Sequence, residues 1–384
     1  MAKTVKWILV FLLSAALSQA QDLARDRTIG QLEVVATFDG AMPTGVTVAN
    51  SGRIFVNFPR WGDKVEYTVA EVKNGKTVPY PSADINRYAE GDNPVEKLVS
   101  VQSVVVDPTG NRLWILDTGS TAFGPVLPGG AKLIAVDLGS NQIVKKIVFP
   151  ADVALYTSYL NDVRFDMQRG AEGTAFITDS STPGPNAIIV VDLASGKSRR
   201  RLNNHPSTRP DPGVVPVVEG EILQFRLPME APHRFMVGAD GIAISPNGRI
   251  LYYCPLTSRH LYSVSVNALL DESKSDNEVA ATVTDYGEKG GASDGLESDM
   301  EGRVYLTDYE HNAIRRRTSS GDFETLVHDP RLLWPDTLSL AADGYLYVTA
   351  NQVERQGAFH EGHDMRQKPY VLFRVKVDGT RIHP

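Results

Sequence analysis

The sequence is almost devoid of cysteine, with Cys254 alone among 384 residues. A single cysteine excludes an internal disulfide, and with it the disulfide-stapled framework of many small exported proteins. A chain of this length can bury a sufficient core without such bridges. Cys254 ends the apolar run Ile250-Leu251-Tyr252-Tyr253-Cys254. We therefore expect it to be a buried structural thiol.

Long hydrophobic runs are also missing, since no stretch approaches the roughly 20 apolar residues that a membrane-spanning helix needs. The apolar stretch at residues 7–16 is too short, but two lysines precede it and the small residues Ser18 and Ala20 follow it. This order is typical of a secretory signal with a small-residue cleavage site. The sequence therefore predicts a cleaved signal over residues 1–20 and a secreted protein, periplasmic or extracellular. A buried N-terminal helix is the alternative.

Basic charge does not dominate, because 39 lysines and arginines face 46 aspartates and glutamates, for a formal net charge of −7. An acidic balance disfavours nucleic acid or an anionic membrane as partner. The sequence has no P-loop, no dinucleotide glycine fingerprint and no paired C-x-x-C. A G-x-S-x-G match at residues 291–295 opens a repeat rather than a strand-to-helix turn, so it is not read as a nucleophile elbow. The stretch 360–364 lacks the spacing of a zincin helix.

Long helical patterns are absent, apart from a short predicted helix at 266–270, and an internal repeat stands in their place. Each copy has two small or polar residues, an alternating apolar stretch, a glycine turn and a second apolar or aromatic stretch. The copies are residues 44–58, 102–118, 161–179, 240–255, 294–308 and 336–351. Their turn glycines are Gly52, Gly110, Gly173, Gly248, Gly302 and Gly344. Period-two alternation around a glycine turn is the signature of a β-hairpin.

Further strand-like runs, such as 132–136 and 187–191, follow most copies, so each unit holds about four strands. Six such units predict an all-β fold, a six-bladed β-propeller with four-stranded antiparallel blades around a central channel. Radial closure also protects the apolar strand edges that an open sandwich would expose. We expect one propeller domain over residues 21–384. The longer insertions at 197–216 and 352–368 are expected to be surface loops.

The polar pairs that open the repeats should converge around one mouth of the channel. Their first members are Thr44, Gln102, Asn161, Asp240, Asp294 and Asp336. Three carboxylates at one mouth must bind a cation, find hydrogen-bond donors, or hold at least one raised pKa. A metal held by oxygen ligands alone would be Ca²⁺ rather than Zn²⁺, and an organic amine would satisfy the same charge. Each aspartate could instead cap a backbone turn of its own blade.

The order of several motifs resembles the Yellow and major royal jelly protein family across nearly the whole mature chain. In the first half these are Pro43-Thr44-Gly45-Val46, Phe55-Val56-Asn57-Phe58-Pro59-Arg60-Trp61, Pro79-Tyr80-Pro81-Ser82, Arg112-Leu113-Trp114-Ile115-Leu116-Asp117-Thr118-Gly119 and Tyr159-Leu160-Asn161-Asp162-Val163. In the second half they are Asp240-Gly241-Ile242-Ala243, Tyr252-Tyr253-Cys254-Pro255-Leu256, Leu333-Trp334-Pro335-Asp336-Thr337-Leu338 and Thr349-Ala350-Asn351. The resemblance implies a six-bladed propeller and a secreted protein.

The functions that this resemblance implies are diverse. Family members include melanin-pathway proteins, some with dopachrome-converting activity, salivary proteins that bind biogenic amines in the channel, and nutritional proteins. In the amine-binding members a threonine and an asparagine line the pocket, and the matching positions here are Thr337 and Asn351. The aromatic residue that follows that asparagine by two positions is replaced by Val353. The paired cysteines usual in the insect members are missing.

A broader similarity is to gluconolactonase-type propellers, in which a Glu, an Asn and an Asp hold a divalent cation that activates a lactone. Asp294-Gly295 resembles their Ser-Asp-Gly string, Asp240 stands where their Asn would be, and Thr44 replaces the Glu. This similarity implies calcium as the cofactor, held by Asp240, Asp294 and Asn161.

Three functional hypotheses follow. In the first, the channel binds a small polar or cationic organic molecule, either without chemistry or with isomerase-type turnover. Its ligand-binding residues would be Asn161, Asp240, Asp294, Asp336, Thr337 and Asn351. In the second, the protein is a calcium-dependent lactonase. In the third, it is a non-catalytic structural or protein-binding ring.

Overall fold

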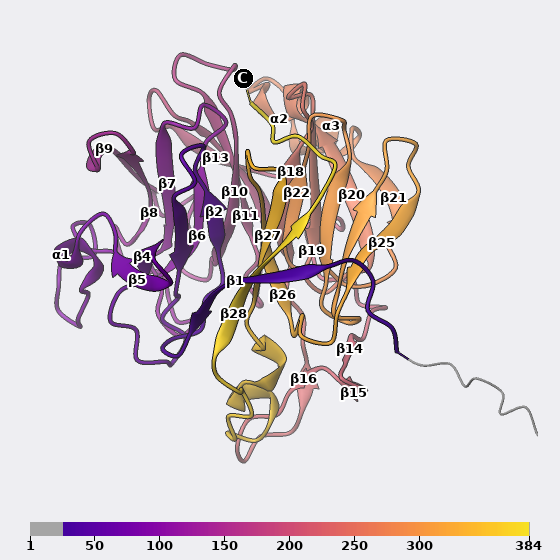
Figure 1. The fold of residues 1–384 in the computed structure, drawn as a ribbon. Helices are drawn as coiled ribbons and strands as arrows, with labels where there is room; N and C mark the ends of the chain where they lie inside the picture. Colours follow the sequence, from indigo (N-terminus) through magenta and orange to yellow (C-terminus); the bar gives the residue numbers. More distant parts are fainter. Residues whose placement is uncertain (1–25, 384) are drawn as a thin grey trace, which may run out of the picture.

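The computed structural model describes residues 26–383, so the predicted secretory signal at 1–20 lies outside the described residues. Six four-stranded antiparallel sheets are arranged around one axis (Figure 1), which confirms the predicted six-bladed β-propeller. Within residues 26–383, no helix is long and apolar enough to cross a membrane.

The first three blades follow one another along the chain, each with its innermost strand first. Blade one is β2(Val46–Val48), β3(Ile54–Asn57), β4(Val69–Lys73) and β5(Lys76–Pro79). Blade two is β6(Val101–Val106), β7(Arg112–Thr118), β8(Ala131–Asp137) and β9(Gln142–Val148). Blade three is β10(Leu160–Asp166), β11(Thr174–Asp179), β12(Ala187–Asp192) and β13(Ser198–Arg201). All six predicted hairpins, here and in the later blades, coincide with the two inner strands of a blade.

The second half of the ring is interrupted by insertions. Blade four is β18(Ala239–Ile244), β19(Ile250–Pro255), β20(His260–Ser265) and β21(Thr284–Glu288). Blade five is β22(Leu296–Ser298), β23(Val304–Asp308), β24(Ala313–Arg317) and β25(Phe323–His328), and blade six begins with β26(Pro335–Leu340), β27(Tyr345–Ala350) and β28(Tyr370–Lys376). The short helices are α1(Ala83–Asn86), the predicted α2(Val266–Leu270), α3(Asp276–Ala280), η1(Val353–Arg355) and η2(Gly357–Phe359). Two small hairpins, β14(Val217–Val218)–β15(Glu221–Ile222) and β16(Gln224–Phe225)–β17(His233–Arg234), lie between blades three and four.

The N-terminal strand closes the ring. Strand β1(Leu32–Phe38) pairs antiparallel with β28, from Leu32 opposite Val375 to Phe38 opposite Tyr370, and so becomes the outer strand of blade six. Blade six is therefore built from both ends of the chain. Closure removes the open sheet edge that a linear row of blades would leave.

The core lies between the faces of adjacent blades. Trp114 of blade two, for example, stacks on Phe165 of blade three with ring centroids 5.1 Å apart. Cys254 is buried in the contact between blades four and five, as expected. The six turn glycines all have positive φ, from 63° to 99°, a region that favours glycine.

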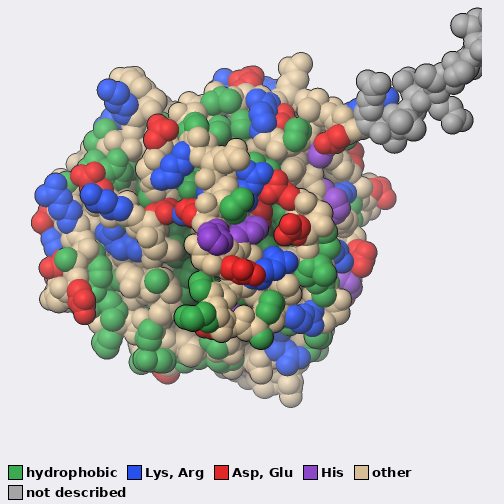
Figure 2. All heavy atoms as spheres, turned by 90° about the horizontal axis from the view of Figure 1, so that it is seen from below, with side chains coloured by type: hydrophobic (Ala, Val, Ile, Leu, Met, Phe, Trp, Pro, Cys, Tyr) green, Lys and Arg blue, Asp and Glu red, His purple; other side chains and the backbone are tan. Residues whose placement is uncertain are grey.

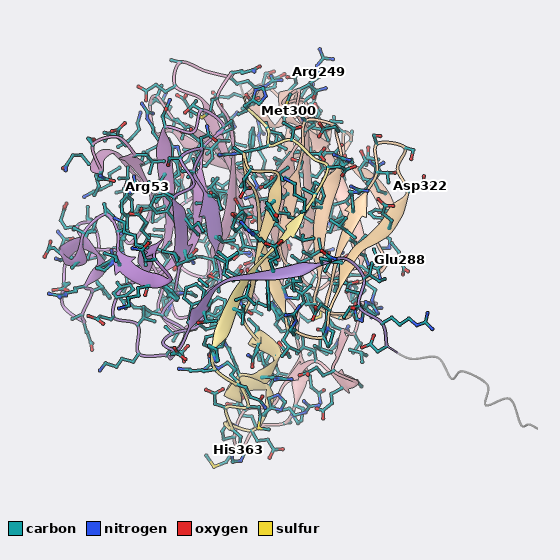
Figure 3. The ribbon with its side chains drawn as sticks, viewed as in Figure 1. Arg53, Arg249, Glu288, Met300, Asp322 and His363 are labelled. Atoms are coloured by element: carbon teal, nitrogen blue, oxygen red, sulfur yellow. The ribbon has the colours of Figure 1, made fainter. Side chains whose placement is uncertain are left out.

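The two ends of the ring are built differently. The small hairpins and the segment that carries η1 and η2 project from one end, where Figure 3 places His363, and Arg249 and Met300 lie at the other end. We call the first end the mouth. At the opposite end the C-terminal tail crosses the channel, where Arg381 donates to the carbonyl oxygens of Val106 at 2.8 Å and Val48 at 3.3 Å. The tail thus covers that end of the ring.

Two expectations about loops were wrong in part. The insertion at 197–216 begins with β13, because Ser198 to Arg201 pair with β12 as the outer strand of blade three. The insertion at 352–368 is not a solvated loop, since Val353, Glu354 and Phe359 are buried. Charge and glycine content suggested exposure, but this segment packs its apolar side chains over the mouth.

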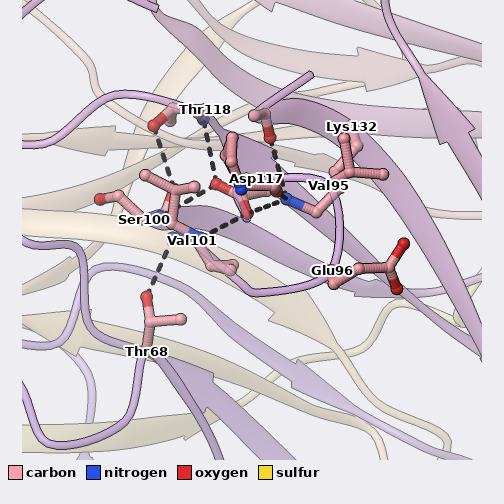
Figure 4. A network of polar contacts seen from close by, with 12 residues as sticks. Thr68, Val95, Glu96, Ser100, Val101, Asp117, Thr118 and Lys132 are labelled. Carbon is pink, nitrogen blue, oxygen red and sulfur yellow. Dashed lines mark hydrogen bonds and ion pairs between the residues drawn. The ribbon is translucent and has the colours of Figure 1, made fainter. Parts of the chain in front are cut away.

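A buried ion pair fixes the loop that leads to the polar pair of blade two (Figure 4). The Lys132 ammonium lies 2.7 Å from the Asp117 carboxylate, and both side chains are fully buried. Asp117 also accepts from the backbone N–H groups of Val99 at 2.7 Å and Ser100 at 2.9 Å. Buried charges persist where they are paired and hydrogen-bonded. The pair therefore holds the chain two residues before Gln102.

We predict that Lys132→Met destabilises the protein by about 3–5 kcal/mol, because it leaves the Asp117 charge buried without its cation. The matched control is Lys146→Met, which removes a pair with Glu96 whose side chains are 27% and 63% exposed. That change should cost no more than about 1 kcal/mol. Chemical denaturation of both variants makes the comparison. Equal losses of unfolding free energy in the two variants would show that burial does not increase the effect of removing the Lys132 cation.

Candidate functional site

A pocket of about 400 Å³ opens at the mouth and runs down to the channel axis. Figure 2 views this end, where hydrophobic side chains gather in and beside a hollow near the middle of the face. The pocket is lined by Trp61, Gln102, Phe123, Gly124, Pro125, Tyr156, Thr157, Ser158, Tyr159, Asn161, Ser180, Ser181, Thr182, Pro183, Phe225, Phe235, Val237, Asp240, Leu256, Asp294, Trp334, Val353, Gln356, Ala358 and Phe359. It has the size of a small-molecule site.

The polar part of this lining includes Asn161, Asp240 and Asp294, which open the inner strands of blades three, four and five. The Asn161 amide donates to one oxygen of Asp240, and the Asp240 and Asp294 carboxyl groups are hydrogen-bonded to each other. The Trp334 indole N–H donates to Asp294 Oδ2 at 2.8 Å. Each carboxyl group is therefore held in place from two sides.

Glycine at the second position of a polar pair lets neighbouring blades come this close. A Cβ atom on Gly241 would lie 2.2 Å from the Asp294 carbonyl oxygen. One on Gly295 would lie 2.3 Å from the Asp336 carbonyl oxygen. Any larger residue would push the blades apart and separate the carboxylates.

The other three predicted ligand-binding residues are placed differently. Asp336 is buried beside the pocket rather than in its lining, where it accepts from Asn351 Nδ2 at 2.7 Å and from Thr337 Oγ1 at 3.0 Å. Thr337 also lines a cavity of about 60 Å³ toward the closed end of the channel, together with Arg164 and Arg381. The structure thus brings Asp336, Thr337 and Asn351 together beside the pocket, where the Asp336 carboxyl group still interacts with that of Asp294.

Burial raises the pKa of all three aspartates. For Asp240 and Asp336 the pKa lies well above the usual range, because the charge of Asp294 adds to the effect of burial. The pKa of Asp294 rises only to about 6, because hydrogen bonds from Trp334 and Asp240 oppose burial. Near neutral pH Asp294 is therefore mostly ionised, whereas burial favours the protonated forms of Asp240 and Asp336.

One side of the pocket is an aromatic wall that sequence reasoning missed. Trp61 stacks on Phe123 with ring centroids 4.9 Å apart, and Phe123 lies 5.0 Å from Tyr159. The Trp61 indole N–H donates to the Tyr159 hydroxyl at 2.6 Å, and that hydroxyl donates to Gln102 Oε1 at 2.9 Å. These hydrogen bonds hold the Trp61 and Tyr159 side chains next to Gln102, the first member of the polar pair of blade two.

The facing wall is aromatic as well. Phe225 stacks on Phe359 at 5.2 Å, and Phe235 meets Trp334 edge to face at 6.2 Å. Val353, which stands where the resemblance implied an aromatic residue, also lines the pocket. Phe359, on the next short helix, supplies an aromatic ring from the same insertion.

A signal in the sequence could have found part of these walls. Tyr159 and Trp334 each stand two residues before the first member of a polar pair, a position that points to the same mouth. Phe225 and Phe359 carry no such signal, because they come from insertions that lie outside the repeat.

The site does not resemble a preformed calcium site. Over residues 26–383 there is no group of three or more His, Cys, Asp or Glu side chains arranged to hold a metal ion. Calcium takes six to eight oxygen ligands, whereas here the carboxyl oxygens of Asp240 and Asp294 already face an amide, an indole and each other.

We predict that the apo protein loses stability as pH rises from 5 to 7. A carboxyl group whose pKa is raised on folding stabilises the protein below its unfolded pKa, and this contribution is lost as pH rises through the folded pKa. For Asp294, with a pKa of about 6, the loss is about 1 kcal/mol over this window. The free energy of unfolding of Asp294→Asn, measured by chemical denaturation at pH 5 and pH 7, should change less between the two pH values.

The control for this prediction is Asp152→Asn, which changes an exposed aspartate and should keep the pH dependence of the unmodified protein. An unchanged slope in Asp294→Asn would mean that Asp294 is not a buried carboxyl group with a raised pKa.

The fold is shared with solved propellers of other kinds. A calcium-binding protein, regucalcin, from Agrobacterium tumefaciens matches with a TM-score of 0.53 and 13% identity over 91% of this chain and 98% of that chain. A gluconolactonase from Xanthomonas campestris matches with a TM-score of 0.52 and 13% identity over 91% of this chain and 90% of that chain. At this identity the likeness extends to the fold alone.

Curated relatives match by sequence. Protein yellow of Drosophila erecta is 25% identical over 248 residues, which is 62% of this chain and 43% of the relative. Major royal jelly protein 7 of Apis mellifera is 27% identical over 207 residues, 52% of this chain and 42% of the relative. The chain thus spans less than half the length of these relatives. The family model described as major royal jelly protein matches residues 99–380, more than half of the chain, so the chain belongs to the major royal jelly protein family.

Proposed function

We propose that this chain binds a small polar or cationic organic molecule in the central pocket, with Asp294 as the counter-ion. The observation that supports the proposal is the buried Asp240–Asp294 pair in a pocket with aromatic walls. A charged group of the ligand would face Asp294, and its carbon skeleton would pack against the walls.

The energetics favour such an occupant. An ionised carboxylate in a desolvated pocket is costly unless a cation or donors accompany it. A positively charged group would stabilise ionised Asp294 and would interact with the faces of nearby aromatic rings, an interaction of about 0.5–2 kcal/mol. Neutral polar ligands would gain only the hydrogen bonds to Asn161 and Asp240.

The same pair supports isomerase-type turnover as the finer proposal. Two carboxyl groups whose pKa values are pushed apart can serve as base and acid in one site. Asp294 would take a proton from a bound molecule, and Asp240 would return one at another atom. The step needs no external reactant, because Asp294 gains one proton and Asp240 loses one. Transfer of a proton from Asp294 back to Asp240 then restores the starting state.

We also propose that the protein is exported, since residues 1–20 have the order of a secretory signal. N-terminal sequencing of protein recovered outside the cytoplasm should begin at Gln21. A mature protein that retains Met1 would contradict export by this signal.

We predict that Asp294→Asn weakens binding of benzylammonium by about 1.5–3 kcal/mol, the range of a charge-assisted hydrogen bond. In the unmodified protein the affinity should rise about tenfold per pH unit below the Asp294 pKa and level off above it, because the cation requires the ionised carboxylate. Calorimetric titration measures both effects, and Asp152→Asn is the control.

Two results would contradict this proposal. Lost stability with unchanged binding in Asp294→Asn would favour an inert ring in which the aspartate fastens its own blade. A melting temperature that rises with calcium, falls with EDTA and becomes insensitive in Asp294→Asn would favour the lactonase, with Asp240, Asp294 and Asn161 as calcium ligands.

A further inference from the structure

The segment at residues 352–360, which we call the wall segment, separates the central pocket from a second cavity. Its Val353, Gln356 and Ala358 line the central pocket. Its Glu354 and Arg355 line the second cavity, which has a volume of about 260 Å³. Phe359 lines both. The far side of the second cavity comes from the small hairpins that precede blade four.

Glu354 is the unusual group in this cavity. Its side chain is only 5% exposed, and both carboxylate oxygens are buried without a hydrogen bond from another residue. Buried polar atoms in folded proteins are nearly always hydrogen-bonded, so an unpartnered pair of carboxylate oxygens calls for an explanation. A bound molecule that supplies the missing donors would explain it.

The cations already present are committed elsewhere. Arg355 Nε lies 3.8 Å from Glu354, but the Arg355 guanidinium donates to Glu219 at 2.7 and 2.5 Å. Arg226 donates to the carbonyl oxygens of Phe359 at 3.2 Å and Ile222 at 3.3 Å. Glu354 is therefore the buried acid of the cavity whose carboxylate has no donor from another residue, since Glu219 accepts from Arg355 and Glu221 is 68% exposed.

We propose that the second cavity binds a small organic guanidinium or ammonium cation, with Glu354 as its carboxylate partner. A guanidinium matches two unpartnered carboxylate oxygens with two parallel N–H donors. Leu223, Phe359 and Met365 offer apolar surface for a short carbon chain. No side chain holds the Glu354 carboxylate by a hydrogen bond, so the donors of a bound cation would not have to displace one. This site is separate from the central pocket and adds to the proposed function.

The charge environment of Glu354 agrees with this assignment. Burial is the main cause that raises the pKa of Glu354 to about 7; Glu219 also raises it, whereas the backbone of Glu354 itself and the charge of Arg355 lower it. The other titratable groups around the cavity are Glu221, Arg226 and His360. A bound cation would favour the ionised carboxylate, so binding should strengthen as pH rises through 7.

The test uses the full chain with the central pocket disabled by Asp294→Asn, because Phe359 belongs to both cavities. On this background, n-butylguanidinium is titrated with and without Glu354→Gln. We expect Glu354→Gln to weaken binding by about tenfold to a hundredfold, the equivalent of one charge-assisted pair. Glu221→Gln, which changes an acid whose side chain is 68% exposed at the cavity rim, should change the affinity less than about twofold.

The neutral isostere n-butylurea should bind at least about tenfold more weakly than n-butylguanidinium, since it lacks the charge. A blocked Gly-Arg-Gly peptide distinguishes the source of the cation. Binding of n-butylguanidinium alone indicates a free small molecule, and equal binding of the peptide indicates an arginine side chain. Either result supports the site.

Equal affinity for n-butylguanidinium with and without Glu354→Gln, or equal affinity for n-butylguanidinium and n-butylurea, would overturn the proposal. Should Glu354→Gln fail to fold, the pH series on the Asp294→Asn protein decides, because affinity should rise about tenfold between pH 6 and 8. A flat series would overturn the proposal as well. Failure of the central-pocket proposal would appear separately, as unchanged benzylammonium binding in Asp294→Asn.

Discussion

Closure of the ring by β1 on β28 is the constraint on which the site depends. The central pocket takes polar groups from blades two to five and its aromatic rings from several segments around the mouth. No single blade supplies the whole site. The pairing of the two chain ends holds six separate sheets at one distance from the axis, and the positions of Asp240 and Asp294 follow from that distance.

Close approach of the blades sets the electrostatics of the mouth. Gly241 and Gly295 leave room for a neighbouring backbone, so three carboxyl groups come together out of water. Burial then raises the pKa values of all three, and the charge of Asp294 adds to this effect at Asp240 and Asp336. A channel of the same fold with other residues at these positions would have different chemistry, which is why a shared propeller fold does not transfer a function.

The insertions add what the repeat does not contain. The small hairpins and the wall segment bring Phe225 and Phe359 over the mouth, and they enclose the second cavity with Glu354. Both cavities combine a buried carboxyl group with apolar or aromatic surface. The wall segment lies between them, and its Phe359 lines both cavities.

The sequence by itself determined the blades, because the alternation of apolar residues and the turn glycines are local properties that each hairpin expresses on its own. It also placed Asn161, Asp240 and Asp294 at one mouth, since all six inner strands begin at the same end. Only the tertiary structure decided that Asp336 lies beside the pocket rather than in its lining, that the N-terminal strand completes blade six, and that the wall segment packs over the mouth. Those outcomes depend on contacts between segments far apart in the chain, and no local pattern of residues encodes which distant surface a strand or loop will cover.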